Sequence, residues 1–215
     1  MIDNRETNLD NEEITTDITV NSKVKFNAGK VAELLRKLEK ILGVSLSIRS
    51  TTGEVVCKTD YCYGPCSYIR GTDIGCKRCR KVYSNIGKKM LMRKVPYACF
   101  CYCGFLIFAV PLNFRGEMIG LLVGSQIIPV SSDFSVSDFC DKYKRGLKAL
   151  GLNNNKDFLE SFKKVKTLDN NKQRLKFLYY LEEVSKHFES MALDEKTWNA
   201  FLREIKASIP EFGNF

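Results

Sequence analysis

The sequence predicts an α+β fold in which a PAS-like antiparallel sheet is flanked by helices and followed by a C-terminal helical extension. Three observations predict it. Apolar residues follow helical spacing over residues 28–42, two hairpin patterns lie between residues 44 and 128, and helical patterns return after residue 133. A helix, two strands, a second helix and further antiparallel strands are typical of a small sheet with helices packed on one side.

The N-terminal segment, residues 1–26, differs from the rest of the chain in charge and pattern. It is rich in Asn, Asp, Glu and Thr and shows no apolar periodicity. Residues 1–22 carry six acidic residues and one Arg, a net charge of −5 within a chain whose total is +9. We expect this segment to be a flexible acidic arm or a strand that forms late in folding.

The central segment alternates between helical and extended patterns. The helix over residues 28–42 is amphipathic, and Gly43 supplies its stop. Residues 44–50 and 55–56 form a first hairpin, and a loop around Gly64 and Pro65 precedes a basic helix over residues 74–94. Apolar and polar residues alternate over residues 97–103, and a longer hairpin joins residues 105–112 to 118–128.

The C-terminal segment reads as wholly helical over residues 133–150, 155–167, 170–193 and 194–208. An apolar stripe follows the third of these helices, at Leu175, Leu178, Leu181, Val184, Phe188 and Met191. Such a stripe either packs against the sheet or the first helix, or forms a dimerising or signal-transmitting surface.

Length, hydropathy and charge narrow the class of protein. The apolar runs at 105–110 and 119–130 are shorter than the roughly 20 residues of a membrane-spanning helix, and the N-terminus has no signal-peptide pattern, so we expect a cytoplasmic protein without a membrane partner. The body is basic, but its Lys and Arg residues are spread along helices, so direct nucleic-acid binding is not expected. The single histidine, His187, argues against Cys-His catalysis, and no nucleotide-binding or hydrolase motif is present.

Cysteine is the unusual residue of this chain. Eight of the nine cysteines fall between residues 57 and 103, and only Cys140 lies outside. Structural disulfides are disfavoured in a reducing compartment, so three explanations stay open: metal ligation, a redox-active thiol pair, or thiols that line a buried pocket without any cofactor.

Several separated motifs resemble one known family. They are Pro65-Cys-Ser-Tyr-Ile-Arg70, Gly75-Cys76, Pro96-Tyr-Ala-Cys-Phe-Cys-Tyr-Cys-Gly-Phe-Leu106, Ala109-Val-Pro111 and Gly116-Glu-Met-Ile-Gly-Leu-Leu-Val-Gly-Ser-Gln126. In this order, over residues 28–150, they resemble the PocR sensory domain. That family looks like a PAS variant of bacterial transcription regulators and sensor kinases, which implies binding of small hydrocarbon derivatives such as diols.

The resemblance places cysteines of the family at Cys66, Cys76 and Cys101, its arginine at Arg70 and its glycine at Gly104. The chain departs from the family pattern at three positions, because Tyr102 replaces a common histidine, Cys103 a small residue and Cys79 a polar one. The ligand-binding candidates are Arg70, Tyr97, Tyr102, Gly104, Phe108 and Gln126, and the cofactor-binding candidates are Cys66, Cys76, Cys79, Cys101 and Cys103.

Cysteine spacing bears on which metal the site would hold. On a helix, Cys76 and Cys79 lie on one face, whereas Cys99, Cys101 and Cys103 of an extended segment would be about 6.6 Å apart in steps of two residues. That spacing is wide for one zinc ion, so an iron–sulfur cluster is the first choice of metal centre and zinc the second. Its expected ligands are Cys66, Cys76, Cys79 and Cys101.

The sequence therefore predicts a non-catalytic signal-sensing domain, with residues 1–26 as the arm, 27–150 as the sensory domain and 151–215 as a helical extension that packs on it or mediates dimerisation. The domain would bind a small organic ligand or a cysteine-ligated metal centre and act on a partner or output domain. The alternative is a redox or metal-binding protein that transfers electrons or assists an enzyme.

Overall fold

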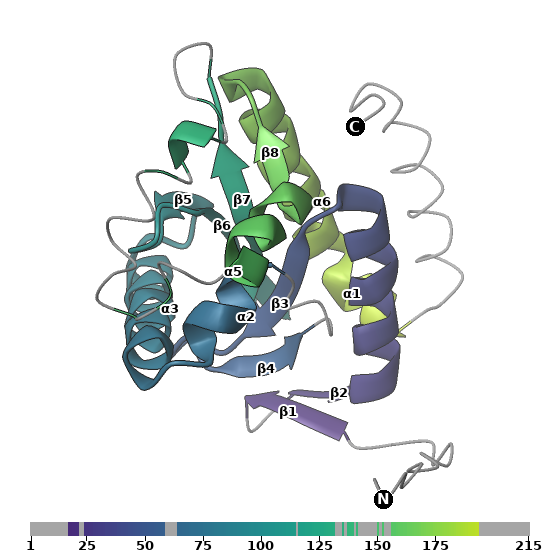
Figure 1. The fold of residues 1–215 in the computed structure, drawn as a ribbon. Helices are drawn as coiled ribbons and strands as arrows, with labels where there is room; N and C mark the ends of the chain where they lie inside the picture. The colour runs from purple at the N-terminus through teal and green to yellow at the C-terminus, as the bar shows by residue number, and fades with distance from the viewer. Residues whose placement is uncertain are drawn as a thin grey trace, which may run out of the picture.

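The structure is a computed structural model of the 215-residue chain (Figure 1). It describes residues 17–21, 24–58, 64–114, 116–131, 135, 137–139, 141, 150, 152 and 156–193.

A six-stranded sheet organises the described residues. Its strands are β3 (Ser45–Arg49), β4 (Val55–Lys58), β5 (Tyr97–Phe100), β6 (Leu106–Phe114), β7 (Glu117–Pro129) and β8 (Lys166–Leu168). The order β4-β3-β7-β6-β5 is antiparallel throughout, and β8 pairs in parallel with the last residues of β7. The long strand β7 is buried over ten successive residues, which explains its nearly continuous apolar sequence. The predicted α+β PAS-like fold is confirmed.

Helices cover both faces of this sheet rather than the single face that the sequence suggested. They are α1 (Ala28–Leu42), α2 (Pro65–Arg70), α3 (Asp73–Arg93), α5 (Lys156–Ser161), a short 3₁₀ helix (Phe162–Lys164) and α6 (Asn171–Leu193). In Figure 1, α1 and α6 lie on one side of the sheet and α3 on the other. A separate two-stranded sheet, β1 (Asp17–Asn21) and β2 (Val24–Asn27), precedes α1 and overlaps the segment predicted as an acidic arm.

The two faces have separate apolar cores because side chains alternate along β6. Leu106, Phe108 and Val110 point to the α1 and α6 side, where they join one buried cluster. Ile107 and Ala109 point to the opposite side, where α3 supplies Tyr83, Ile86 and Met90. A third cluster, at the end of the sheet, gathers Ile69, Cys103, Phe105, Ile128, Phe139, Phe158 and Phe162.

The apolar stripe of α6 packs against the sheet along most of its described length. Leu181, Val184 and Phe188 are buried in the α1 and α6 core, whereas Leu175 is 67% exposed. Gly124 of β7 allows the close approach of this helix, because a Cβ atom there would lie 2.9 Å from the Phe177 ring. The packing explanation of the stripe is therefore confirmed for these three buried residues.

The structure corrects three local predictions. The segment expected as a loop at Pro65 is helix α2, which Pro starts well because its missing N–H is not needed in the first turn. The segment 155–167, expected to be helical, changes after α5 into the edge strand β8. The extended segment that was expected to reach residue 103 ends with β5 at Phe100.

The remaining helical predictions fall mostly outside the described residues, including 194–208 and most of 133–150. Helix α6 agrees with the prediction for 170–193. Within the described part of the chain, no helix is long and apolar enough to cross a membrane.

Candidate functional site

A small cavity lies at the end of the α3 side of the sheet, where α2, the first half of α3, the β5–β6 loop and the end of β7 meet. Its volume is about 20 Å³, which by the same measure is room for about one water molecule. Its walls are formed by Cys66, Ile69, Arg70, Cys79, Val82, Tyr83, Cys101, Tyr102, Cys103, Phe105, Ile107, Ser125 and Gln126. We call these residues the cavity lining.

Four cysteines from three elements converge on this cavity. Cys66 comes from α2, Cys79 from α3, and Cys101 and Cys103 from the β5–β6 loop. Cys66 and Cys101 are 35 positions apart in the sequence, so only the tertiary fold brings them together. The fold therefore brings these four thiols, but not Cys76, beside one hollow.

The β5–β6 loop sets the positions of Cys101 and Cys103. Cys101 and Phe105 close the loop, since the Cys101 N–H donates to the Phe105 carbonyl at 2.8 Å. Inside it, the Gly104 N–H donates to the Cys101 carbonyl, and Gly104 has a φ of +81°, which glycine adopts without strain. The turn brings the Cys103 N–H to 3.3 Å from the Cys101 Sγ, so both cysteines reach the cavity.

Tyr102 ties this loop to α3. Its hydroxyl donates to the Gly75 carbonyl at 3.1 Å and lies 3.7 Å from the Cys79 Sγ. Burial, followed by hydrogen bonds with Cys79 and Cys103, raises the pKa of Tyr102 well above its usual value, so the hydroxyl keeps its proton. The neighbouring Arg78 guanidinium lies 5.7 Å from the ring centre.

Gln126 is the most unusual residue of the cavity lining. The register of β6 against β7 shifts between Leu106 and Phe108, which face Ile127 and Gly124, so β7 has an extra residue there. Gln126 takes up this bulge with a φ of +63°, and its neighbour Ser125 also lines the cavity. Gln126 is 8% exposed, and its Nε2 donor has no hydrogen-bond partner among the described residues.

Arg49, behind the cavity wall, stacks on Tyr83 of the lining, and the two form a second polar layer. The Arg49 guanidinium carbon lies 3.4 Å from the centre of the Tyr83 ring, and its Nη1 donates to the Gly53 carbonyl at 2.9 Å. Burial lowers the pKa of Arg49 from its usual value, while the same burial raises the pKa of Tyr83. The positive charges of Arg49 and Arg70 oppose this rise in the pKa of Tyr83, so both guanidinium groups influence this part of the cavity wall.

Cys101 favours the thiol form. Hydrogen bonding with Cys103 and then burial raise the pKa of Cys101 far above 9.0. Because the thiolate is the nucleophile and the metal ligand, a cysteine held as a thiol is a poor attacking group. All seven cysteines that the structure describes are free of disulfide bonds.

The cysteine arrangement was also tested as a metal site. In the described ranges, no group of three His, Cys, Asp or Glu side chains is placed to hold one metal ion. The predicted iron–sulfur centre, with zinc as the second choice, stays a prediction.

The structure brings most of the predicted site residues together. Cys66, Arg70, Cys79, Cys101, Tyr102, Cys103 and Gln126 all line the cavity. Cys76 is half-buried on α3 and is not part of the lining, and Gly104 contributes through the turn it forms.

Tyr97 and Phe108 lie elsewhere. The Tyr97 hydroxyl accepts a hydrogen bond from the Lys89 Nζ at 2.7 Å near the surface. Phe108 belongs to the opposite core, with its ring centre 5.1 Å from that of Phe177.

Sequence reasoning missed Arg49, Tyr83 and Ser125. The sequence did contain one signal, because Arg49 ends a strand whose three preceding residues are buried, and a buried arginine needs a partner. Its partner Tyr83 is 34 positions away and could not be chosen from spacing alone.

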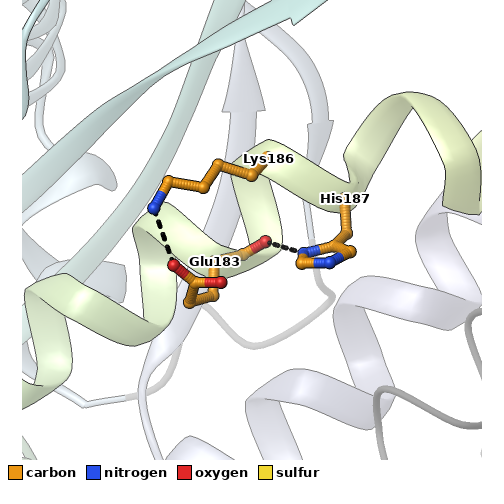
Figure 2. Close-up of polar contacts among 3 residues, drawn as sticks. All are labelled: Glu183, Lys186 and His187. Atoms are coloured by element: carbon orange, nitrogen blue, oxygen red, sulfur yellow. Dashed lines mark hydrogen bonds and ion pairs between the residues drawn. The ribbon is translucent and has the colours of Figure 1, made fainter.

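His187 has a local role on α6. Figure 2 shows its ring turned back along the helix, where Nδ1 lies 2.8 Å from the Glu183 carbonyl oxygen. Lys186 forms an ion pair with the Glu183 carboxylate at 2.7 Å. His187 is not part of the cavity lining.

Comparison with known proteins gives one match. A family model described as the sensory domain found in PocR matches residues 25–193, from β2 to the last residue of α6. The match includes every residue of the cavity lining and continues beyond residue 150. No curated protein and no solved structure gives a significant match.

Proposed function

Because the chain belongs to the family of sensory domains found in PocR, we propose that it is a non-catalytic signal-sensing domain whose cavity binds a small organic ligand. Binding would be passed to a protein partner or an output domain. The observation that carries this proposal is Gln126, a buried amide donor without a hydrogen-bond partner among the described residues, on a strained bulge of the cavity wall.

The composition of the cavity lining suits a binding site for a small molecule. Such sites are mostly apolar, with a few placed polar groups that orient the ligand. Ile69, Phe105 and Ile107 supply the apolar surface, while Arg70 and Gln126 supply hydrogen-bond donors.

The size of the cavity indicates that this structure is a closed form. A volume of about 20 Å³ has room for water but not for an organic molecule, so the walls must move when a ligand enters. The β5–β6 loop is the wall best suited to move, because among the described residues its polar contacts with α3 are made by Tyr102. The Tyr102 hydroxyl contacts the Gly75 carbonyl and the Cys79 Sγ, and its ring lies 5.7 Å from the Arg78 guanidinium. Ligand binding would select the form in which this loop has opened.

A path for the signal leads from the cavity to the β3–β4 turn. Tyr83 lines the cavity on one side and stacks on Arg49 on the other, and Arg49 holds the Gly53 carbonyl. Gly53 lies directly against α3, since a Cβ atom there would be 2.4 Å from the Tyr83 backbone. A shift of Tyr83 would therefore move the turn, where a partner could detect it.

In a second candidate function, the same cavity holds a cysteine-ligated metal centre. An iron–sulfur cluster is the first choice of metal centre and zinc the second. The convergence of Cys66, Cys79, Cys101 and Cys103 favours it. When bound, an iron–sulfur cluster would supply one-electron chemistry, and the four cysteines would hold it as thiolates. This would make the chain a redox sensor or an electron-transfer protein.

One experiment separates these candidates. The chain is purified without oxygen, its iron, zinc and sulfide are measured, and its melting temperature is followed while small organic compounds, including 1,2-propanediol, are added. A colourless, metal-free protein that a compound stabilises by several degrees supports the sensor of small molecules. Stoichiometric iron and sulfide that disappear in Cys101→Ser but not in Cys57→Ser, outside the lining, support the metal centre.

A cavity-filling variant locates the binding. Val82→Phe places a larger side chain into the lining, and Val95→Phe makes the same change at a site that is 53% exposed. We expect only Val82→Phe to abolish the ligand-induced rise in melting temperature. A rise that survives in a folded Val82→Phe protein would contradict binding in this cavity.

A further inference from the structure

We propose that the solvent-facing side of α3 is a docking surface for an acidic segment of a partner protein, one that carries apolar residues at both ends. This inference rests on the proposed sensing function and names the kind of partner that would receive the signal.

Helix α3 differs from the other long helices in its charge. It has seven basic side chains and a single acidic one, Asp73. Helix α1 contains the ion pair of Glu33 with Lys37, and α6 contains that of Glu183 with Lys186. None of the seven α3 cations forms an ion pair with a residue that the structure describes. Like charges repel one another along a helix, and carboxylates from a partner would relieve this repulsion.

Exposed residues form a stripe along one side of α3, which lies on the side of the sheet away from α1 and α6 (Figure 1). We call the following six residues the α3 stripe: Ile74, Lys77, Lys81, Lys88, Leu91 and Met92. Apart from Leu91, they follow one another in steps of three, four or seven residues, which places them on one helical face. Met92 is 77% exposed. Apolar side chains therefore mark both ends of the stripe, and lysines occupy its middle.

This pattern favours a protein segment over other negatively charged partners. Aliphatic side chains such as Leu91 and Met92 do not stack on bases, so a nucleic acid would use the cations alone. A lipid surface that took up the apolar ends would also remove the ammonium groups of Lys81 and Lys88 from water, which is unfavourable. A second copy of the chain would bring the same positive charge. A segment with carboxylates in its middle and apolar residues at its ends satisfies every part of the stripe.

The α3 stripe lies beside the turn at which the proposed signal path ends. Gly87 of α3 touches the β3–β4 turn, since a Cβ atom there would lie 2.3 Å from the Thr51 carbonyl oxygen. Leu91 is four residues farther along the helix, one turn beyond Gly87 on the same side. A partner docked on the stripe is therefore placed to contact the turn, and a shift of the turn on ligand binding would change the docking.

The test uses a synthetic helical peptide as the probe. It has about 18 residues, which at 1.5 Å per residue equals the length of the α3 stripe, with leucines at both ends and glutamates between them on one face. A control peptide has glutamine at each glutamate position. Fluorescence anisotropy measures the binding of both peptides to the whole chain. We expect the acidic peptide to bind at least tenfold more tightly than the control peptide, and added sodium chloride to weaken its binding.

Two pairs of variants locate the docking. Lys81→Glu reverses a charge in the middle of the stripe, and Lys172→Glu makes the same change at an exposed position of α6. Met92→Gln removes an exposed apolar side chain from the stripe, and Leu175→Gln removes one from α6. We expect peptide binding to weaken tenfold or more in Lys81→Glu and threefold or more in Met92→Gln, and to stay within twofold in the two α6 variants. Circular dichroism checks that every variant is folded.

The outcomes separate this inference from the function on which it rests. Absence of binding by the acidic peptide, or binding that folded Lys81→Glu and Met92→Gln both retain, overturns the docking surface. Tighter binding of double-stranded DNA or of phosphatidylglycerol vesicles than of the acidic peptide also overturns it. If a small organic compound still raises the melting temperature in those cases, the sensing function stands without this docking surface. If the peptide binds as expected but no compound stabilises the chain, the docking surface stands and the sensing function fails.

Discussion

The two faces of β6 and β7 use the same strands for different purposes. On the α1 and α6 side, side chains such as Leu106, Val110 and Leu122 form a large apolar core, and α1 also carries the buried acid Glu39. On the α3 side, the apolar core ends at a cavity where Arg49, Ser125 and Gln126 are buried. One face is mainly an apolar core, and the other ends in a cavity with buried polar groups.

This difference indicates where stability and function reside. Apolar burial stabilises the fold roughly in proportion to the area removed from water. Buried polar groups, a bulge and a positive φ destabilise it, and proteins retain such features mainly at functional sites. Substitutions on the two faces should therefore separate folding from binding.

The largest effect is expected on the apolar face. Phe177 is 2% exposed and contacts Phe108, so Phe177→Ala should lower the free energy of unfolding by about 3–5 kcal/mol through lost burial and a new cavity. Urea unfolding measures this change in the free energy of unfolding. Leu175→Ala, two residues earlier and 67% exposed, should change the free energy by less than about 0.5 kcal/mol.

The comparison would fail if Phe177→Ala removed ligand binding from protein that is still folded. Binding should depend on the α3 side alone, so the dissociation constant of the folded fraction is expected to stay within twofold of the original.

A smaller loss of stability is expected behind the cavity. Arg49→Lys keeps the charge but loses the planar stacking on Tyr83 and the hydrogen bond to the Gly53 carbonyl, at a cost of about 1–3 kcal/mol. It should also weaken the response of the β3–β4 turn to ligand, measured by hydrogen exchange at residues 51–54. Arg93→Lys at the end of α3 serves as the control. Equal effects of Arg49→Lys and Arg93→Lys on stability and on hydrogen exchange would contradict the role of Arg49.

The sequence predicted the regular face better than the cavity. Periodicity predicted α1 and both hairpins because apolar spacing at short range determines them, and α6 lies close to its predicted limits. Proximity of cysteines in the chain, together with a family resemblance, predicted much of the cavity lining. Of the residues carried over from the family, Cys66, Arg70 and Cys101 line the cavity, whereas Cys76 does not.

What the sequence could not supply was the direction of individual side chains. Alternation alone would send Gln126 to the same face as Gly124, and only the bulge turns it into the cavity. Likewise, the turn at 101–104, rather than an extended strand, brings Cys101 and Cys103 together. The parallel strand β8 is three residues long, too short for a recognisable pattern.

A pH effect should be confined to the cavity face. Hydrogen bonding with Cys103 and burial raise the pKa of Cys101 above its ordinary value of 9.0, so the folded state retains a proton that the unfolded state releases. The contribution of this proton to the free energy of unfolding is fully present below pH 9. It is lost as the pH rises, by up to about 1.4 kcal/mol per pH unit.

Urea unfolding between pH 8 and 10 measures this loss, and Cys101→Ala should show a shallower decline than the original chain. Identical slopes for both proteins would show that Cys101 does not ionise differently in the folded and unfolded states.

The smallest effect tests the strain at Gln126 itself. Glycine accepts the φ of +63° without strain, and Gln126→Gly also removes the unpartnered buried amide, so the variant should be more stable by about 0.5–1 kcal/mol. Ser125→Gly, one residue earlier and outside the positive-φ region, should instead lose about 0.5–1 kcal/mol. Thermal unfolding shows whether each variant is more or less stable than the original chain. A more stable Gln126→Gly protein that no longer shows the ligand-induced rise in melting temperature would mean that the strained glutamine is kept for its ligand. A less stable protein would mean that the side chain supports the fold, and the contrast between the two faces would then lose its basis.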